Sequence, residues 1–232
     1  MMMAPNDPAK DKLLDAILPH VAFDGWAPAA FEMAVAEVGI DSTYAKTLCP
    51  RGAVDLAIAY HNRGDAAMVA ALKDAPMSDL RFRDKVALAV RLRLKSIDDK
   101  EAVRRGTALF ALPHMAPDGA KLVWGTADAI WVALGDTSRD INWYSKRMIL
   151  SGVYASVVLY WLGDESLDNQ ATDAFIDRRI ADVMQFEKVK AQVNDSPLFK
   201  SFTDPLSRML SGISAPRDIP PVDLPGMWRD PQ

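Results

Sequence analysis

The sequence predicts an all-α protein in which a short helix-turn-helix head is followed by a larger helical bundle. Apolar residues recur at helical spacing along almost the whole chain, and alternating apolar–polar runs bounded by turn signals are scarce. The first three predicted helices are short and joined by tight turns, whereas the later helices are long. An amphipathic segment and a proline-rich tail complete the chain.

The head is predicted to contain three helices with clear local boundaries. Gly25 follows the first helix, Pro28 begins the second, and Gly39 ends it. Either Asp41 or Ser42 can cap the third. The predicted ranges are 11–23, 29–38 and 42–48.

The body is predicted to contain six longer helices, at 52–72, 80–97, 98–110, 118–134, 138–162 and 172–193. The helix at 80–97 is strongly amphipathic, with its Arg and Lys residues expected on the solvent-facing side. The longest apolar run, 148–162, is shorter than the roughly 20 residues of a membrane span and is interpreted as a core helix. The predicted organisation is a flexible N-terminus (1–10), head (11–51), body (52–195), membrane helix (196–214) and tail (215–232).

Length, composition and net charge indicate what kind of core and which binding partners the chain can have. The chain has 232 residues, half of them hydrophobic, and a formal net charge of −4. A sizeable core can therefore be buried, and broad attraction to phosphate groups is not expected. Cys49 is the single cysteine, which excludes an internal disulfide. Residues 1–8 have neither the apolar core of a signal peptide nor the arginines of a transit peptide.

The chain lacks the residue patterns of common catalytic and metal sites. His20, His61 and His114 are the only histidines, and none lies three or four residues from another. The sequence has no Glu-x-x-His pair for a di-iron centre, no nucleotide-binding glycine motif and no nucleophile elbow. We therefore expect neither catalysis nor a cofactor. His114 is predicted to lie in a turn. Its role there is either structural or a contact to a lipid headgroup.

The third helix of the head carries few side chains that could recognise DNA. Base edges and phosphates are contacted mainly by Arg, Lys, Asn and Gln, and residues 42–50 offer one of these, Lys46. Residues 26–63 contain four acidic and three basic side chains, so DNA binding is not expected. The helix-turn-helix unit is interpreted as structural.

Residues 198–213 predict an amphipathic helix at a membrane surface. The net charge of 196–216 is only +1, so apolar insertion would dominate, and Pro205 can divide the segment into two helical pieces. The segment could lie on the bilayer or fold over the body as a lid. The apolar residues that share an arc of about 120° on the helical wheel are Leu198, Phe199, Phe202, Leu206, Met209, Leu210 and Ile213.

The head resembles the N-terminal domain of the tetracycline-repressor (TetR) family. The similarity lies in residues 13–16 (LLDA), 24–26 (DGW) and 34–44 (AVAEVGIDSTY). It covers about a quarter of the chain, and it implies a TetR-like fold and a homodimer built on the late helices. A TetR-type ligand-sensing transcriptional regulator is the alternative function.

A second block resembles the lipid-binding accessory protein family of coenzyme Q (ubiquinone) biosynthesis. It comprises residues 111–117 (ALPHMAP), Ile130 with Trp131, and residues 135–147 (GDTSRDINWYSKR). The resemblance implies a non-enzymatic protein that binds an isoprenoid, quinone or phospholipid ligand in its larger domain. It also implies docking on a membrane through the C-terminal helix and presentation of the lipid to the di-iron demethoxyubiquinone hydroxylase. Because no transit sequence is visible, we expect a cytoplasmic location, peripheral to the inner membrane of a bacterium.

The same resemblance implies a surface patch that contacts the hydroxylase, at Ile130, Asp140, Trp143 and Tyr144. Two adjacent aromatic residues lie about 100° apart on a helix, so at least one should be near the surface. Alternatively, Trp143 packs against Trp131 or Trp124. Thr137 or Ser138 is the expected cap of the helix that carries the patch.

The wall of the lipid pocket is expected on the apolar helix at 148–160 and on nearby aromatic residues. Gly152 and Ser156 could leave space for a cavity, although close helix packing explains small residues equally well. The candidate wall residues are Leu109, Phe110, Leu112, Trp124, Trp131, Leu150, Tyr154 and Val157.

Overall fold

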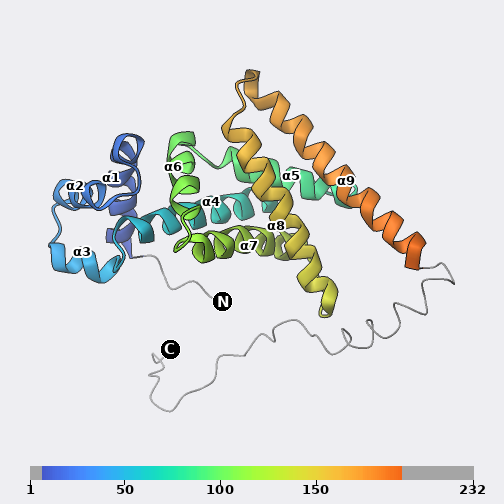
Figure 1. Ribbon diagram of the computed structural model, residues 1–232, viewed down its shortest axis with the longest axis horizontal. Coiled ribbons are helices and arrows are strands. Elements are labelled where there is room, and N and C mark those ends of the chain that lie inside the picture. Colours follow the sequence, from blue (N-terminus) through green and yellow to red (C-terminus); the bar gives the residue numbers. More distant parts are fainter. Residues whose placement is uncertain (1–6, 195–232) are drawn as a thin grey trace, which may run out of the picture.

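The computed structural model describes residues 7–194, with side chains to residue 183, and the regular secondary structure of this part of the chain is helix alone (Figure 1). The predicted all-α class and the order of the helices are confirmed. The helices are α1 (Pro8–Asp24), α2 (Pro28–Val38), α3 (Ser42–Leu48), α4 (Ala53–Asp74), α5 (Phe82–Lys95), α6 (Lys100–Phe110), α7 (Ala116–Ala133), α8 (Ile141–Leu162) and α9 (Gln170–Asn194), with a short 3₁₀ turn at Leu167–Asn169.

Helices α1, α2 and α3 form the head around a core of their own. Asp41 caps α3 because its carboxylate accepts from the N–H groups of Thr43 and Tyr44. Gly39 ends α2 in the left-handed conformation, at φ 71°, which glycine adopts without strain. The head core includes Leu13, Leu14, Ile17, Phe31 and Ala45, and the first turns of α4 close it.

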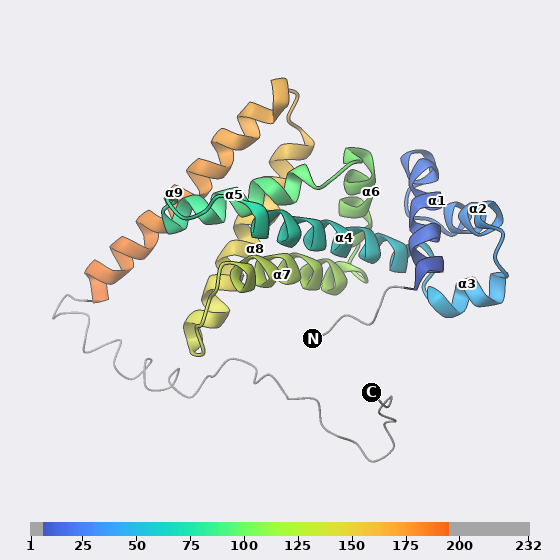
Figure 2. The same cartoon turned by 180° about the vertical axis from the view of Figure 1, so that it is seen from behind.

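Helix α4 connects the head to the body, and α7 packs along it (Figures 1 and 2). The second core lies between α4, α5, α7, α8 and α9. Its fully buried side chains include Met68, Val90, Ile130, Val157 and Ile176. Helix α6 contacts α1 on one side and α7 on the other, so it lies between the head and the body.

The start of α8 differs from the sequence prediction. The helix begins at Ile141, and its cap is Asp140, whose carboxylate accepts from the N–H of Asn142 at 3.1 Å. The expected cap at Thr137 or Ser138 is therefore wrong. The physical reason is that Ser138 serves the preceding loop, where its hydroxyl donates to Asp136 at 2.8 Å.

Among residues 7–194, no helix is both long and apolar enough to span a membrane. The apolar run at 148–162 belongs to α8, and seven residues of that helix, among them Val153 and Trp161, are buried. The proposed membrane helix at 196–214, the tail at 215–232 and most of the flexible N-terminus lie outside the described residues, so those parts of the organisation remain predictions.

Candidate functional site

The body contains a cavity of about 480 Å³ lined by α4, α5, α6, α7 and α8, with Leu18 of α1 and Trp26 on its head side. Its size suits a small organic ligand or part of a lipid. Most of its lining is aliphatic or aromatic: Leu18, Trp26, Ala57, Tyr60, Ala67, Ile97, Ala102, Val103, Phe110, Leu122, Val123, Tyr154, Ala155, Val158 and Leu159. The cavity is the strongest candidate for a functional site in the described residues.

Helix α6 closes the cavity toward the head, and Trp26 holds it there. The indole N–H of Trp26 donates to the carbonyl of Ala102 at 3.0 Å, across 76 residues of sequence. The Trp26 ring also packs against Tyr60, with 5.9 Å between ring centroids. The head therefore contributes to the wall of the cavity as well as to its own core.

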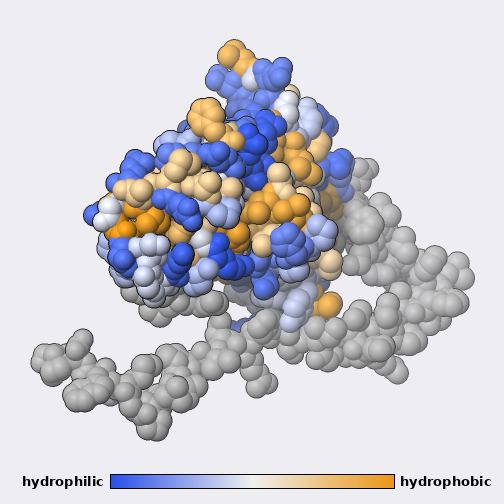
Figure 3. Space-filling model, turned by 60° about the vertical axis from the view of Figure 1, so that its left-hand side comes forward, coloured by the Kyte–Doolittle hydropathy of each residue, from blue (hydrophilic) through white to orange (hydrophobic). Residues whose placement is uncertain are grey.

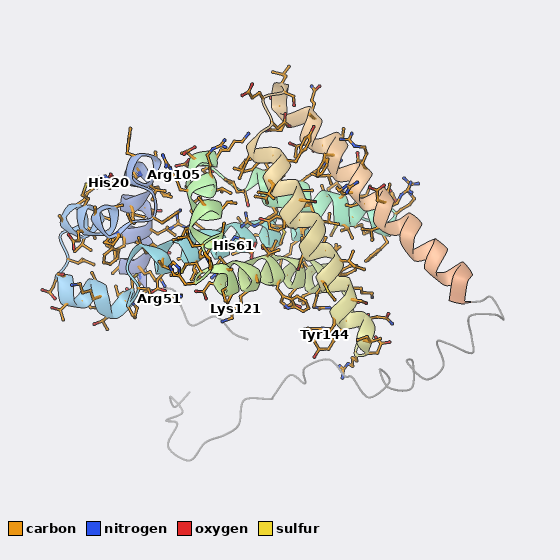
Figure 4. All side chains as sticks on the ribbon, in the orientation of Figure 1. His20, Arg51, His61, Arg105, Lys121 and Tyr144 are labelled. Carbon is orange, nitrogen blue, oxygen red and sulfur yellow. The ribbon has the colours of Figure 1, made fainter. Side chains whose placement is uncertain are left out.

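One side of the cavity carries a connected group of polar side chains, of which Arg93 and Thr126 are buried and His61 and Asp65 are partly buried. The guanidinium Nε of Arg93 donates to Asp65 at 2.6 Å. The hydroxyl of Thr126 donates to the same carboxylate at 2.9 Å, and His61 Nε2 lies 2.8 Å from the Thr126 oxygen. His61 lies in the interior of the body (Figure 4). Because α4, α5 and α7 each supply a member, this group also ties three helices together.

Burial decides which of these groups carry charge. Burial lowers the pKa of His61 to about 4, although the neighbouring Asp65 acts in the opposite direction. Burial likewise raises the pKa of Tyr154 to about 12. Burial also opposes the charge of Arg93, but Tyr154 and Asp65 together raise its pKa above the ordinary value. At neutral pH the group therefore holds a guanidinium beside neutral His61 and Tyr154.

The structure places the eight predicted wall residues in different surroundings. Phe110 and Tyr154 line the cavity. Trp131 and Leu150 line a second, smaller cavity of about 210 Å³ between α5, α7, α8 and α9. The remaining four lie elsewhere: Leu109 packs against the head core, Leu112 is exposed, Trp124 packs against Trp143, and Val157 is in the body core. Those four are wrong as cavity walls, because a linear pattern does not give the helix side that faces the cavity.

The predicted partner patch lies at the first turn of α8, where Figure 4 shows Tyr144 near the free end of the helix. Asp140 is exposed, and Trp143 and Tyr144 are half-buried. Trp143 also packs against Trp124, with 5.9 Å between ring centroids, as the alternative interpretation expected. Ile130 is fully buried in the body core, so its placement in a surface patch is wrong.

A buried ion network beneath the patch holds this end of α8 in place. The Arg147 side chain is only 2% exposed and pairs with Asp128 at 2.6 Å and with Asp136 at 3.1 Å. Its guanidinium carbon lies 4.0 Å from the centroid of the Trp143 ring. Burial would raise the pKa of Asp136, but hydrogen bonds from Lys146, Ser138 and Arg147 bring it down to about 2. The orientation of Trp143 therefore depends on Arg147.

The head presents a mixed surface. Hydrophilic and apolar residues alternate over the end of the molecule that Figure 3 turns forward. On α3 the Tyr44 hydroxyl donates to Asp7 at 3.0 Å, and the Thr47 hydroxyl donates to the carbonyl of Thr43 at 3.0 Å. Two polar side chains of the helix that would enter a DNA groove are thus engaged within the protein.

Sequence reasoning missed Arg93 and Asp65. Arg93 was expected on the solvent-facing side of its helix, but it is buried, and this expectation is wrong. The sequence does contain a signal for the burial of Arg93. It follows Val86 and Val90 at helical spacing and so lies on the same apolar face of α5. In the described ranges, no three His, Cys, Asp or Glu side chains are grouped to hold a metal ion.

The sequence is similar to one protein family and to several curated proteins. Residues 116–187 match the family model described as COQ9, and this range contains α7, α8 and the first part of α9. The chain is 30% identical over 196 residues to the "Probable ubiquinone biosynthesis protein coq9, mitochondrial" of Dictyostelium discoideum, which covers 81% of this chain and 63% of that protein.

The bovine and human proteins named "Ubiquinone biosynthesis protein COQ9, mitochondrial" are 26% and 25% identical over 196 residues, covering 80% of this chain and 60% of each of them. The chain thus spans less than two thirds of the length of these relatives.

A solved structure shows the same fold. The crystal structure of a TetR transcriptional regulator from Nitrosomonas europaea superposes with a TM-score of 0.62 at 18% identity, covering 75% of this chain and 97% of that one. The TetR-like fold predicted from the sequence is therefore confirmed. The matched family model and the relatives likewise confirm the predicted resemblance to the coenzyme Q family. The fold, the family match and the relatives agree in showing that the chain is similar to the COQ9 family, whose model matches residues 116–187.

Proposed function

We propose that this chain is a non-catalytic protein of ubiquinone biosynthesis that binds an isoprenoid or quinone-type lipid in the cavity and presents it to the demethoxyubiquinone hydroxylase. The observation that carries the proposal is the cavity itself, which is mostly apolar and large enough for a ring and part of a tail. The names of the relatives, which are ubiquinone biosynthesis proteins, support the assignment to ubiquinone biosynthesis. The membrane helix, the peripheral membrane location and the homodimer remain part of the proposal.

The lipid-binding part predicts that a prenyl quinone or phospholipid co-purifies with the protein from a quinone-making host. Extraction into organic solvent followed by mass spectrometry measures the bound lipid. Ala155 lines the cavity, and Ala155→Trp should reduce the lipid recovered per protein several-fold because the indole occupies the space. Met148 is exposed on the same helix, so Met148→Trp is the matched control and should keep its lipid. Equal lipid in both variants would place the binding site elsewhere.

The partner patch gives a second prediction. Trp143→Lys should weaken binding to the hydroxylase by about tenfold or more, because aromatic side chains at the centre of an interface carry much of its affinity. Binding of the two purified proteins can be measured by biolayer interferometry. Tyr144→Ala provides a smaller change at the same surface, with thermal unfolding to show that each variant is folded.

Leu167 is highly exposed and lies just beyond the opposite end of α8, so Leu167→Lys is the control for an added surface charge. If Trp143→Lys and Tyr144→Ala both bind as tightly as this control, the patch assignment is wrong.

The TetR-type regulator remains the alternative function. The fold of the Nitrosomonas europaea protein favours it at the level of architecture. Against it, Lys46 is the single basic residue of α3, and Asp41 lies directly at its N-terminus. A helix with this charge offers little attraction to phosphate groups. We therefore assign the head a structural role in closing the cavity.

A further inference from the structure

The second cavity lies between α5, α7, α8 and α9, on the side of the body away from the head (Figure 1). Its interior is apolar and includes Val86, Leu150, Val153 and Ile180, each at most 8% exposed. Its volume of about 210 Å³ exceeds the roughly 150 Å³ of an engineered cavity that binds benzene. The second cavity therefore suits one short apolar group, such as a ring or a single alkyl chain.

The rim of the second cavity is polar and aromatic. Its polar residues, Arg83, Asn142, Ser145 and Lys146, are exposed or half-buried. Phe82 and Trp131 stack beside them, with 5.6 Å between ring centroids. The Arg83 side chain lines the second cavity and is 44% exposed, so a ligand that enters from solvent can reach its guanidinium.

Arg83 is the rim cation that is not firmly paired. Arg81 donates to both carboxylate oxygens of Asp84, at 2.6 and 3.3 Å, whereas Arg83 Nε lies 3.5 Å from the same carboxylate. Among the residues that the structure describes, Arg83 donates no hydrogen bond. Two cations thus share one carboxylate at this end of α5, and Arg81 holds it.

The cations on the α8 side of the rim are balanced by carboxylates. Lys146 and Arg147 both pair with Asp136, and Arg147 also pairs with Asp128. Lys146 Nζ has a further hydrogen bond to the Ser138 hydroxyl at 2.6 Å. The surplus positive charge at the rim therefore belongs to the α5 side, where Arg83 lies.

We infer that the second cavity binds a small organic anion, with one apolar group in the interior and a carboxylate that accepts from Arg83. A guanidinium matches a carboxylate because it offers two parallel N–H donors. A neutral head would leave the charge of Arg83 unpaired, and a cationic head would be repelled by it. The two cavities share no lining residue, so this inference goes beyond the proposed function and does not depend on it.

Two tryptophan residues allow binding at each cavity to be followed separately. Trp131 lines the second cavity, and Trp26 lines the larger cavity of the proposed function. The indole N–H of Trp131 donates to the carbonyl of Lys146 at 3.2 Å, and that of Trp26 donates to Ala102. Two-dimensional NMR spectra of the isotope-labelled full chain resolve indole N–H signals, and the variants Trp131→Phe and Trp26→Phe assign these two.

Three probes with the same alkyl chain and different heads test the inference: octanoate, octanol and octylammonium. We expect octanoate to shift the Trp131 signal and to bind about fivefold more tightly than octanol, the upper end of the range for an exposed ion pair. Octylammonium should bind more weakly than octanol. The preference for octanoate should narrow as the salt concentration rises, because salt screens an exposed charge.

Four variants separate the role of Arg83 from a structural one. Arg83→Gln should reduce the affinity for octanoate to that for octanol and leave octanol binding unchanged, whereas a structural defect would weaken both. Lys95→Gln removes an exposed cation from the other end of α5 and should keep the preference. Ser145→Phe narrows the rim and should weaken octanoate and octanol alike. Ala155→Trp fills the larger cavity and should leave the Trp131 response to octanoate intact.

Equal affinities for octanoate and octanol, or a preference that survives Arg83→Gln, would show that Arg83 does not select an anion. A response of the Trp26 signal alone would assign octanoate to the larger cavity and overturn the inference, as would the absence of any response at Trp131. The lipid recovered from the unmodified protein and from Ala155→Trp tests the proposed function independently of these outcomes.

Discussion

Arg147→Met is expected to lower the free energy of unfolding by about 3–5 kcal/mol, the usual cost of removing one partner from a buried ion network. Arg147 is among the largest fully buried side chains of the described residues, and it neutralises Asp136, whose own side chain is only 4% exposed. Methionine fills a similar volume, so the loss should come mainly from Asp136, which would keep Lys146 as its only ionic partner, rather than from a cavity. Urea unfolding followed by circular dichroism measures the change.

A double variant distinguishes this explanation from a simple packing defect. Arg147→Met combined with Asp136→Asn removes the buried charge that Arg147 no longer balances and should recover part of the lost stability, whereas packing loss would remain. Arg81 makes a comparable pair with Asp84 on the surface, and Arg81→Met should cost less than about 1 kcal/mol. A cost for Arg147→Met as small as that of the surface control would show that the network contributes little.

The boundaries of most helices could be predicted because they depend on local chemistry. Pro28 begins α2 and Gly39 ends it, as expected, and Asp41 provides the cap of α3. The exception at the start of α8 is informative. Asp136, Thr137, Ser138 and Asp140 are all suitable caps by residue type, and a tertiary contact decides among them, since Lys146 and Arg147 engage Asp136.

The cavity was much harder to predict from the sequence than the helices. Its wall combines residues from six helices, and a residue's contribution depends on how each helix is rotated against its neighbours. Phe110 and Tyr154 face the cavity, whereas Val157, three residues from Tyr154, faces the core. Small residues explain part of the shape, since Gly64 makes room for Arg93. Such pairings join residues that are distant in sequence, so a linear pattern does not reveal them.

Stability between neutral and mildly acidic pH should depend on His61. Its pKa is about 4 in the folded protein and 6.5 in the unfolded chain, because burial disfavours the charged form beside Arg93. Between these values the unfolded chain binds a proton that the folded protein does not, so stability decreases as the pH falls through 6.5 and levels off below about 4. The total loss is about 3 kcal/mol, with about 2 kcal/mol of it reached by pH 5.

The test compares urea unfolding of the unmodified protein and of His61→Gln at pH 7 and pH 5. Glutamine cannot titrate, so the variant should lose about 2 kcal/mol less on acidification than the unmodified protein. Carboxylates such as Asp136, whose pKa is lowered from 3.8 to about 2, keep their stabilising charge at both values and lose it only at lower pH. Equal pH dependence in the two proteins would mean that the pKa of His61 is the same in the folded protein as in the unfolded chain.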